Sequence, residues 1–188
     1  MLEIHSPTLD DAEALLEFEL ENRNYFEGWI NAREPDYYNL GSVQHAIEMA
    51  QSDASADKAY QFLAKCNGVI VGRVNLTNVS RPYYNKATLG YRIGERFGGN
   101  GYATKAVEQI LEKARIELDL WRIEATIRFD NHGSARVLLN NSFVAYGTAR
   151  RSMKLHGVWY DLIHFERHLS GCASEISSCP ADRTLIEP

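Results

Sequence analysis

Three glycines stand close together in residues 96–104. This segment joins a strand-like run, 88–93, to an amphipathic helix pattern, 104–118. A glycine-rich turn at the start of a helix presents free backbone N–H groups and the positive end of the helix dipole, which together favour binding of a diphosphate. Gly99 and Gly101 also let the backbone approach phosphate oxygens without a Cβ clash, and they can adopt positive φ if the turn requires it.

The same glycines are also compatible with a turn that only begins a helix. A P-loop is excluded because no Gly-Lys-Ser or Gly-Lys-Thr ends the span. A dinucleotide fingerprint is excluded because it needs Gly-x-Gly-x-x-Gly after the first strand of a βαβ unit. If residues 96–104 bind phosphate, they do so through a motif of another kind.

A second polar pair, Asn131 and Ser134, stands where another helix is predicted to begin. Either side chain can cap that helix, as Asn and Ser commonly do. Capping alone does not require both residue types at three-residue spacing. The pair is therefore a candidate for ligand binding as well as for a helix cap.

The elements that position these residues follow from periodicity and turn signals. Asn67-Gly68 is the strongest hairpin signal in the chain. Strands are predicted at 2–5, 60–65, 69–78, 87–93, 122–129, 143–154 and 158–167, and helices after Thr8 and at 42–50, 104–118 and 134–141. This order predicts a mixed α/β or α+β three-layer domain.

The composition predicts one domain, residues 1–169, followed by a polar tail. The chain has 188 residues, of which 45% are hydrophobic, enough for one sizeable core. Residues 170–188 are rich in Ser, Pro and charge without periodicity, which predicts a mobile tail. No window approaches ~18 consecutive apolar residues, and the N-terminal residues lack the pattern of a signal peptide, so a cytoplasmic protein with no membrane partner is expected.

Cysteine usage and charge narrow the function classes further. Cys66, Cys172 and Cys179 lack metal-ligand spacing and cannot all pair, which indicates thiols in a reducing compartment, although a Cys172–Cys179 pair stays open. The net charge of −5 argues against direct nucleic-acid binding. It favours a cationic acceptor, such as an amine.

Two segments resemble one known superfamily. Arg96, Gly99 and Gly101 form Arg-x-x-Gly-x-Gly, which resembles the acetyl-CoA pyrophosphate loop of the GNAT acetyltransferases. Residues 130–143 resemble the Asn-x-x-Ser…Gly-Phe segment of the RimJ/RimL type, the N-terminal acetyltransferases of ribosomal proteins. The chain is therefore similar to that branch in both of its candidate ligand-binding segments.

Further segments carry the same resemblance over residues 1–169. Residues 155–165 resemble the closing hairpin of that type, and residues 21–29 resemble its Glu-Asn-Arg…Trp element. The resemblance implies a GNAT-like three-layer domain, with a mixed, mostly antiparallel sheet of about seven strands and helices on both faces. It implies an acetyl-CoA-dependent N-acetyltransferase, active as a monomer or homodimer, whose acceptor is the N-terminal α-amine of a protein.

The resemblance also implies which residues bind acetyl-CoA. Main-chain N–H groups of the glycine loop hold the pyrophosphate, and the strand around Tyr91 splays from the next strand so that its free edge binds the pantetheine arm. Asn131 faces the same arm. The residues expected to bind the cofactor are Tyr91, Ile93, Arg96, Gly98, Gly99, Asn100, Gly101, Tyr102, Ala103, Thr104, Asn131 and Ser134, and no metal is expected.

Catalysis needs a proton donor for the leaving thiolate, and Ser134 is the candidate. Many GNAT enzymes use a Tyr, but this chain has Leu138 at the matching position. No base is evident, because Thr88 and Met153 stand where relatives carry an acidic residue. Since an α-amino group titrates at about 8, deprotonation through water ranks first. Side-chain candidates for the base are Glu124, then Glu27, Glu34, Asp161 and His132.

The sequence leaves alternatives for the class of acceptor and for the end of the helix at 134–141. A small-molecule amine (polyamine, amino acid or antibiotic) is the alternative acceptor, and a catalytically silent acyl-CoA-binding module is the alternative class. Aromatic residues in 25–38 either shape the acceptor groove or form a core cluster. Asn141-Ser142 replaces the usual Leu-Gly, and we expect Asn141 to adopt the left-handed conformation that Gly supports.

Overall fold

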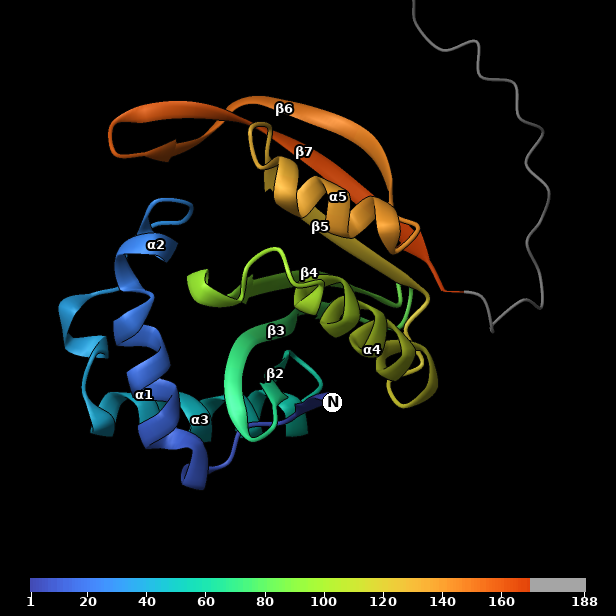
Figure 1. Ribbon diagram of the computed structural model, residues 1–188. Coiled ribbons are helices and arrows are strands. Elements are labelled where there is room, and N and C mark those ends of the chain that lie inside the picture. Colours follow the sequence, from blue (N-terminus) through green and yellow to red (C-terminus); the bar gives the residue numbers. More distant parts are fainter. Residues whose placement is uncertain (170–188) are drawn as a thin grey trace, which may run out of the picture.

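The computed structural model describes residues 1–169, so the predicted tail 170–188 and the open Cys172–Cys179 pair lie outside the described residues. The described chain forms one seven-stranded sheet with the order β1-β2-β3-β4-β5-β7-β6 (Figure 1). The strands are β1 Leu2–His5, β2 Tyr60–Cys66, β3 Val69–Ser80, β4 Lys86–Ile93, β5 Arg122–Arg128, β6 Val144–Leu155 and β7 Val158–His168. All neighbours are antiparallel except β4 and β5, which confirms the mixed, mostly antiparallel sheet.

Helices cover both faces of this sheet (Figure 1). The helices are α1 Ala12–Glu21, α2 Arg23–Glu27, α3 Leu40–Ser55, α4 Tyr102–Ile116 and α5 His132–Asn140, with 3-10 turns at Leu9–Asp11, Pro35–Tyr37 and Glu95–Phe97. α4 contacts β1, β3 and β4, whereas α1 contacts β3 and α3 contacts β2. The result is the predicted three-layer domain.

Alternation along the strands places buried side chains on both faces of the sheet, because successive side chains point to opposite faces. On one face, side chains such as Val74 and Ile123 pack against Val107 and Ile110 of α4 and Leu138 of α5. On the other face, the buried side chains come from α1, α2, α3, β2 and β3: Ala12, Leu15, Phe18, Phe26, Val43, Ile47, Leu63 and Ile70. The apolar sides of α4 and α5 therefore pack on one face of the sheet, and those of α1, α2 and α3 pack on the other.

Local signals in the sequence fix several element ends. Asn67 and Gly68 both have positive φ, 51° and 81°, between β2 and β3, as a two-residue hairpin of the primed type requires. Thr8 and Asp11 form a reciprocal capping box ahead of α1, in which the Thr8 N–H donates to Asp11 Oδ2 at 2.8 Å. The predicted hairpin and the helix start after Thr8 are both confirmed.

The end of α5 differs from the expectation. Asn141 has a φ of −99°, so the prediction that it adopts the left-handed conformation is wrong. Ser142 adopts it instead, with a φ of 58°. The Ser142 N–H donates to the Leu139 carbonyl and the Phe143 N–H to the Leu138 carbonyl, both at 3.0 Å, which is a Schellman motif. The motif requires the left-handed residue one position after Asn141.

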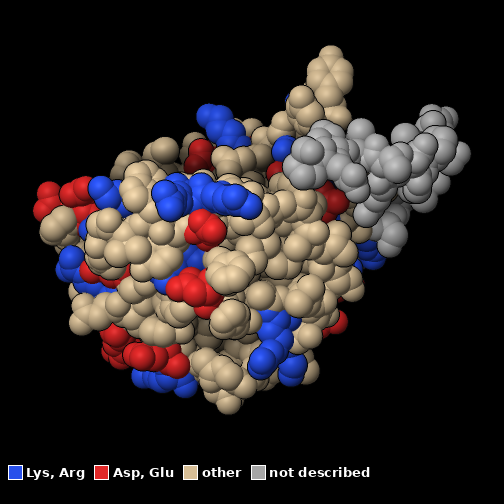
Figure 2. Space-filling view, turned by 90° about the horizontal axis from the view of Figure 1, so that it is seen from above, with Lys and Arg blue, Asp and Glu red and all other residues tan. Residues whose placement is uncertain are grey.

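The surface carries both signs of charge. Figure 2 shows a face on which Lys and Arg side chains lie next to Asp and Glu side chains in several places. Within residues 1–169, no helix is long and apolar enough to cross a membrane. The same residues hold no cluster of His, Cys, Asp and Glu suited to a metal ion.

Candidate active site

The two parallel strands at the centre of the sheet separate along their length. β4 and β5 pair from Lys86 with Arg122 to Leu89 with Ala125. β4 then continues to Ile93 without further pairing to β5, although it stays paired with β3 on its other side. Residues 90–93 therefore turn one row of main-chain N–H and C=O groups toward the opening. This is the splayed strand that the resemblance implied.

A groove of about 960 Å³ passes through this opening. We call it the central groove. Its walls come from the end of β4, the loop before α4, the start of α5 and, on the opposite face, the α2 region and β5. The groove thus connects the α4–α5 side of the sheet with the α1–α2 side, and a ligand on either side can reach the other through it.

The loop before α4 forms one end of the central groove. Gly99 and Gly101 have φ values of 76° and 77°, in the left-handed region that glycine tolerates best. A Cβ built on either glycine meets no atom within 4 Å, so the space above the loop is open. Gly101 is the N-cap of α4, with no side chain capping the helix and no acidic residue in its first turn. The first N–H groups of α4 therefore point into the groove without an internal partner.

Two predicted loop residues stand apart from the groove. Arg96 does not line it; its guanidinium lies 3.6 Å from Glu21 and stacks on Phe97. Asn100 does not line it either, because its amide donates to the carbonyls of Phe97 and Gly98 and so braces the turn. The other predicted loop residues, Gly98, Gly99, Gly101, Tyr102, Ala103 and Thr104, all line the groove.

The start of α5 forms the facing wall. Asn131 is the N-cap: its Oδ1 accepts the Ser134 N–H at 3.0 Å, which leaves the amide NH2 for another partner. The Ser134 hydroxyl makes no hydrogen bond within residues 1–169, so it takes no part in the cap. Tyr91 donates its hydroxyl to the Ser134 carbonyl at 3.1 Å. Burial raises the pKa of Tyr91 to about 12, which keeps this hydroxyl protonated.

Aromatic side chains from the α2 region line the opposite side of the groove: Tyr25, Phe26 and Trp29, together with Ile30. Arg128 of β5 fixes this region to the sheet, because its guanidinium stacks between Trp29 and Tyr160 and donates to the Gly28 carbonyl at 3.0 Å. Of the predicted aromatic segment, Tyr37 and Tyr38 do not line the groove.

A buried cluster of charged side chains lies beside these aromatic residues. Glu19 of α1 is only 1% exposed and accepts from Arg73 of β3, Arg92 of β4 and Arg33. Burial opposes its ionisation, but attraction by the three arginines holds the pKa of Glu19 below its usual value. Burial, together with the neighbouring positive charges of Arg73 and Arg33, lowers the pKa of Arg92 to about 10, although the Glu19 carboxylate opposes the shift. Sequence patterns gave no signal of this cluster, because its members are distant in the chain.

The candidate bases are mostly outside the groove. Glu124 does not line it and lies 2.9 Å from both the Lys86 amine and the Arg122 guanidinium. Glu27, Glu34 and Asp161 do not line it either; Glu27 pairs with Arg23, and Asp161 accepts the Arg151 N–H. The acidic residue that does line it, Asp130, pairs with Arg128, which lowers its pKa. Among residues 1–169, therefore, only the exposed His132 lines the groove as a base free of an ion pair.

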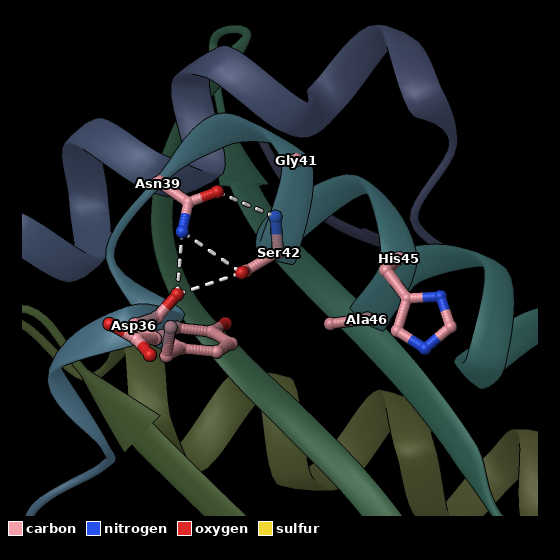
Figure 3. A pocket seen from close by; sticks show the side chains of 7 residues that line it. Asp36, Asn39, Gly41, Ser42, His45 and Ala46 are labelled. Atoms are coloured by element: carbon pink, nitrogen blue, oxygen red, sulfur yellow. Dashed lines mark hydrogen bonds between the residues drawn. The ribbon is translucent and has the colours of Figure 1, made fainter.

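A second hollow, of about 630 Å³, surrounds the start of α3 (Figure 3). Asn39 caps α3 by accepting the Ser42 N–H at 2.9 Å and donates to the Asp36 carbonyl at 2.6 Å. The Ser42 hydroxyl also donates to the Asp36 carbonyl. The polar groups of this helix cap therefore satisfy one another, as Figure 3 shows.

The chain is similar to known proteins of one family. The family model described as "Acetyltransferase (GNAT) domain" matches residues 1–144. The chain is 35% identical to "Probable N-acetyltransferase YjcK" of Bacillus subtilis (strain 168), over 80% of this chain and 84% of that protein. It is 25% identical to "[Ribosomal protein uS5]-alanine N-acetyltransferase" of Escherichia coli (strain K12), over 80% and 79% of the two chains.

The fold is also shared with solved structures. The structure of Mycobacterium smegmatis RimJ in complex with CoA-disulfide superposes with a TM-score of 0.83 and 24% identity. The match covers 89% of this chain and 81% of that one.

Proposed function

Because this chain belongs to the GNAT acetyltransferase family, and thus to the acetyl-CoA-dependent N-acetyltransferases, we propose that its acceptor is the α-amine at the N-terminus of a protein. The observation that carries the proposal is the central groove, which opens on both faces of the sheet. One face offers a binding loop for the cofactor, and the other offers an acceptor channel with an aromatic rim. The similarity to the [Ribosomal protein uS5]-alanine N-acetyltransferase of Escherichia coli supports the same acceptor class.

The residues present fit acetyl-CoA. The free N–H groups at the start of α4 and the open space above Gly99 and Gly101 suit the diphosphate. The unpaired main-chain edge at Tyr91 and Ile93 can form hydrogen bonds with the amides of the pantetheine arm. The free NH2 of Asn131 can donate a hydrogen bond to a carbonyl oxygen of that arm. When bound, acetyl-CoA supplies the thioester that is transferred.

The transfer exchanges one bond to the acetyl carbon for another. The acceptor nitrogen bonds to the thioester carbonyl carbon, the C–S bond breaks, and the sulfur leaves with the electron pair. We assign the proton for that sulfur to the Ser134 hydroxyl, which is not engaged in the helix cap. The Ser134 oxygen then regains a proton from water, and the proton of the amine passes to water.

An acceptor with an accessible pKa suits this site. The groove residues include no carboxylate free of an ion pair among residues 1–169. An α-amine titrates at about 8, so about a tenth of it is already neutral at pH 7. A lysine side chain titrates at about 10.4, so it is almost fully protonated at pH 7 and would need a base to remove its proton. Deprotonation through water is therefore sufficient for an N-terminal α-amine.

The rim of the groove suits a chain end. Tyr25 and Ile30 at the α2 side are 38% and 39% exposed, although both are large and apolar. Exposed apolar side chains that border a groove are typical of a surface that contacts a partner. A peptide that enters with its N-terminus can cover them, and the rest of the acceptor protein stays outside.

CoA release with a matched acceptor panel tests this proposal. The panel contains N-terminal peptides, the same peptides with a blocked α-amine, and free polyamines and amino acids. We expect turnover with the free α-amine peptides and none with the blocked ones. Turnover confined to the free small amines would assign a small-molecule acceptor, and tight acetyl-CoA binding without any turnover would assign a silent binding module.

A further inference from the structure

The acceptor side of the central groove carries an excess of positive charge. Arg73 and Arg92 are directly paired neighbours on β3 and β4, and both line the groove. Arg33 joins them at Glu19. Three arginines therefore face one carboxylate in a largely buried cluster, which leaves two positive charges without a counterpart there. Unpaired positive charge that is shielded from water is costly and favours an anionic ligand.

Arg92 has hydrogen-bonding capacity to spare. Within residues 1–169 its side chain makes a single hydrogen bond, a long one of 3.5 Å from Nη1 to Glu19 Oε2. Its guanidinium otherwise lies over the ring of Phe26, and its side chain is 22% exposed. A guanidinium has several N–H donors in a planar fork, which match the two oxygens of a carboxylate. Arg92 can therefore bind an anion in the groove without giving up its place beside Glu19.

Two buried polar atoms of β3, the strand that pairs with β4 at Arg92, also lack partners. Arg73 is 6% exposed, and its Nε makes no hydrogen bond within the described chain. Asn75, which also lines the groove, has a buried Oδ1 without a partner. Buried polar atoms are almost always satisfied in native proteins, so unsatisfied ones at a groove point to a ligand that completes them. The two atoms are a donor and an acceptor, as a ligand with both a carboxylate and an amide would require.

Building on the function proposed above, we propose that the acceptor carries a carboxylate near its amine and that Arg92, backed by Arg73, binds this carboxylate. Arg92 follows Tyr91 directly in β4, and the Tyr91 hydroxyl contacts the start of α5 where the transfer is assigned. Successive residues of a strand point to opposite faces. The carboxylate site and the transfer site therefore lie on the two sides of one strand, within reach of a short acceptor.

Two kinds of acceptor can supply this carboxylate. One is an acidic side chain at the second or third position of a protein N-terminus, and the other is the α-carboxylate of a free amino acid. The same cluster disfavours polyamines, because their additional ammonium groups would meet Arg92 and Arg73. This outcome differs from the cationic acceptor that the net charge of −5 favoured. Charge inside the groove bears on the ligand more directly than the charge of the whole chain does.

Paired acceptors that differ only in the carboxylate test the proposal. We would measure kcat/KM for Ala-Asp-Gly and Ala-Asn-Gly peptides with amidated C-termini, and for alanine and alaninamide. Wild-type enzyme is expected to prefer the carboxylate member of at least one pair by about 10-fold to 100-fold, which is typical of a hydrogen bond to a charged group. The pair that shows the preference identifies the source of the carboxylate.

Three variants locate the site. Arg92→Gln should reduce the preference to near one, and Arg92→Lys should retain part of it because a lysine keeps the charge without the fork. Arg33→Gln is the matched control, since this substitution also removes an arginine from Glu19, but Arg33 does not line the groove. The Arg33→Gln variant should keep the preference for the carboxylate. Glu19 retains two arginines in each variant, so all three should fold, and their acetyl-CoA affinity should equal that of the wild type.

The outcomes separate this proposal from the proposed function. Turnover by the wild type without preference for a carboxylate in either pair overturns the carboxylate site alone. A preference that survives in Arg92→Gln overturns its assignment to Arg92. Transfer to alanine or alaninamide but to neither peptide overturns the protein acceptor of the proposed function and leaves the carboxylate site to be decided by the alanine pair. No transfer to any amine, by a folded enzyme that binds acetyl-CoA, overturns both proposals.

Discussion

Gly101→Val is the substitution that separates cofactor binding from folding most cleanly. Gly101 has a φ of 77° and a ψ of 0°, and a β-branched residue in this left-handed region costs on the order of 1–2 kcal/mol. No atom lies within 4 Å of the new Cβ, so the Cβ itself adds no clash to that strain. A domain with about 5–15 kcal/mol of stability tolerates this loss. We expect the variant to fold.

Acetyl-CoA binding should suffer far more. The valine side chain would occupy the space above the first N–H groups of α4, where the diphosphate is proposed to bind. Loss of two hydrogen bonds to a charged group, at about 1.5–3 kcal/mol each, amounts to roughly 3–6 kcal/mol. That corresponds to a Kd about 10²-fold to 10⁴-fold higher. Isothermal titration calorimetry with acetyl-CoA measures the change directly.

Gly157→Val is the matched control for backbone strain. Gly157 has a φ of 81°, has no atom within 4 Å of a built Cβ, and lies in the β6–β7 turn outside the groove lining. This variant should lose similar stability and keep its acetyl-CoA affinity. An unchanged affinity in folded Gly101→Val, or an equal loss in Gly157→Val, would refute the assignment of the glycine loop to the diphosphate.

Three further substitutions test other parts of the structure. Ser134→Ala should lower turnover at saturating substrates by about 10²-fold or more, because a proton donor is lost. The melting temperature of this variant should hardly change, since Asn131 supplies the helix cap. Near-normal turnover would contradict the role of Ser134 and would mean that water protonates the leaving thiolate. Glu19→Gln should cost about 3–5 kcal/mol in denaturant unfolding, because it leaves the buried Arg73 without its carboxylate. The lowered pKa of Glu19 means that its contribution is present above a pH of about 4.3 and declines as the pH falls further, so a Gln variant as stable as wild type at neutral pH would contradict this role. Ser142→Gly should stabilise the protein by about 1 kcal/mol by relieving the left-handed strain, and a lower melting temperature would contradict that reading of the helix end.

The sequence predicted the elements well because each carried a local signal. The Asn67-Gly68 hairpin, the capping box at Thr8 and the apolar periodicity of α4 all act over a few residues. The mixed, mostly antiparallel sheet was implied by the family resemblance and is confirmed, and its parallel pair is β4 with β5. The short helix α2 was not predicted, since Arg23–Glu27 is a single aromatic-rich turn without a periodic pattern.

The candidate site was predicted in its main chain and less well in its side chains. The glycines and the edge of β4 are proposed to bind acetyl-CoA through backbone groups, whose positions follow from the fold. Glu124 was a candidate base by its place in a strand, but cross-strand pairing with Lys86 and Arg122 decided its environment. Arg73 and Arg92 stood in ordinary strand segments, and only the packing of α1 against β3 brings Glu19 to them.

The central claim, transfer of acetyl to a protein N-terminal amine without a dedicated base, is tested most directly by site mapping on one acceptor. A peptide with a free α-amine and an internal lysine is incubated with enzyme and acetyl-CoA at pH 7, and tandem mass spectrometry locates the acetyl group. At that pH the neutral fraction of the α-amine exceeds that of the lysine amine by roughly 10²-fold. We predict acetylation of the α-amine; acetylation of the lysine, or of neither amine by an enzyme that binds acetyl-CoA, would contradict the account.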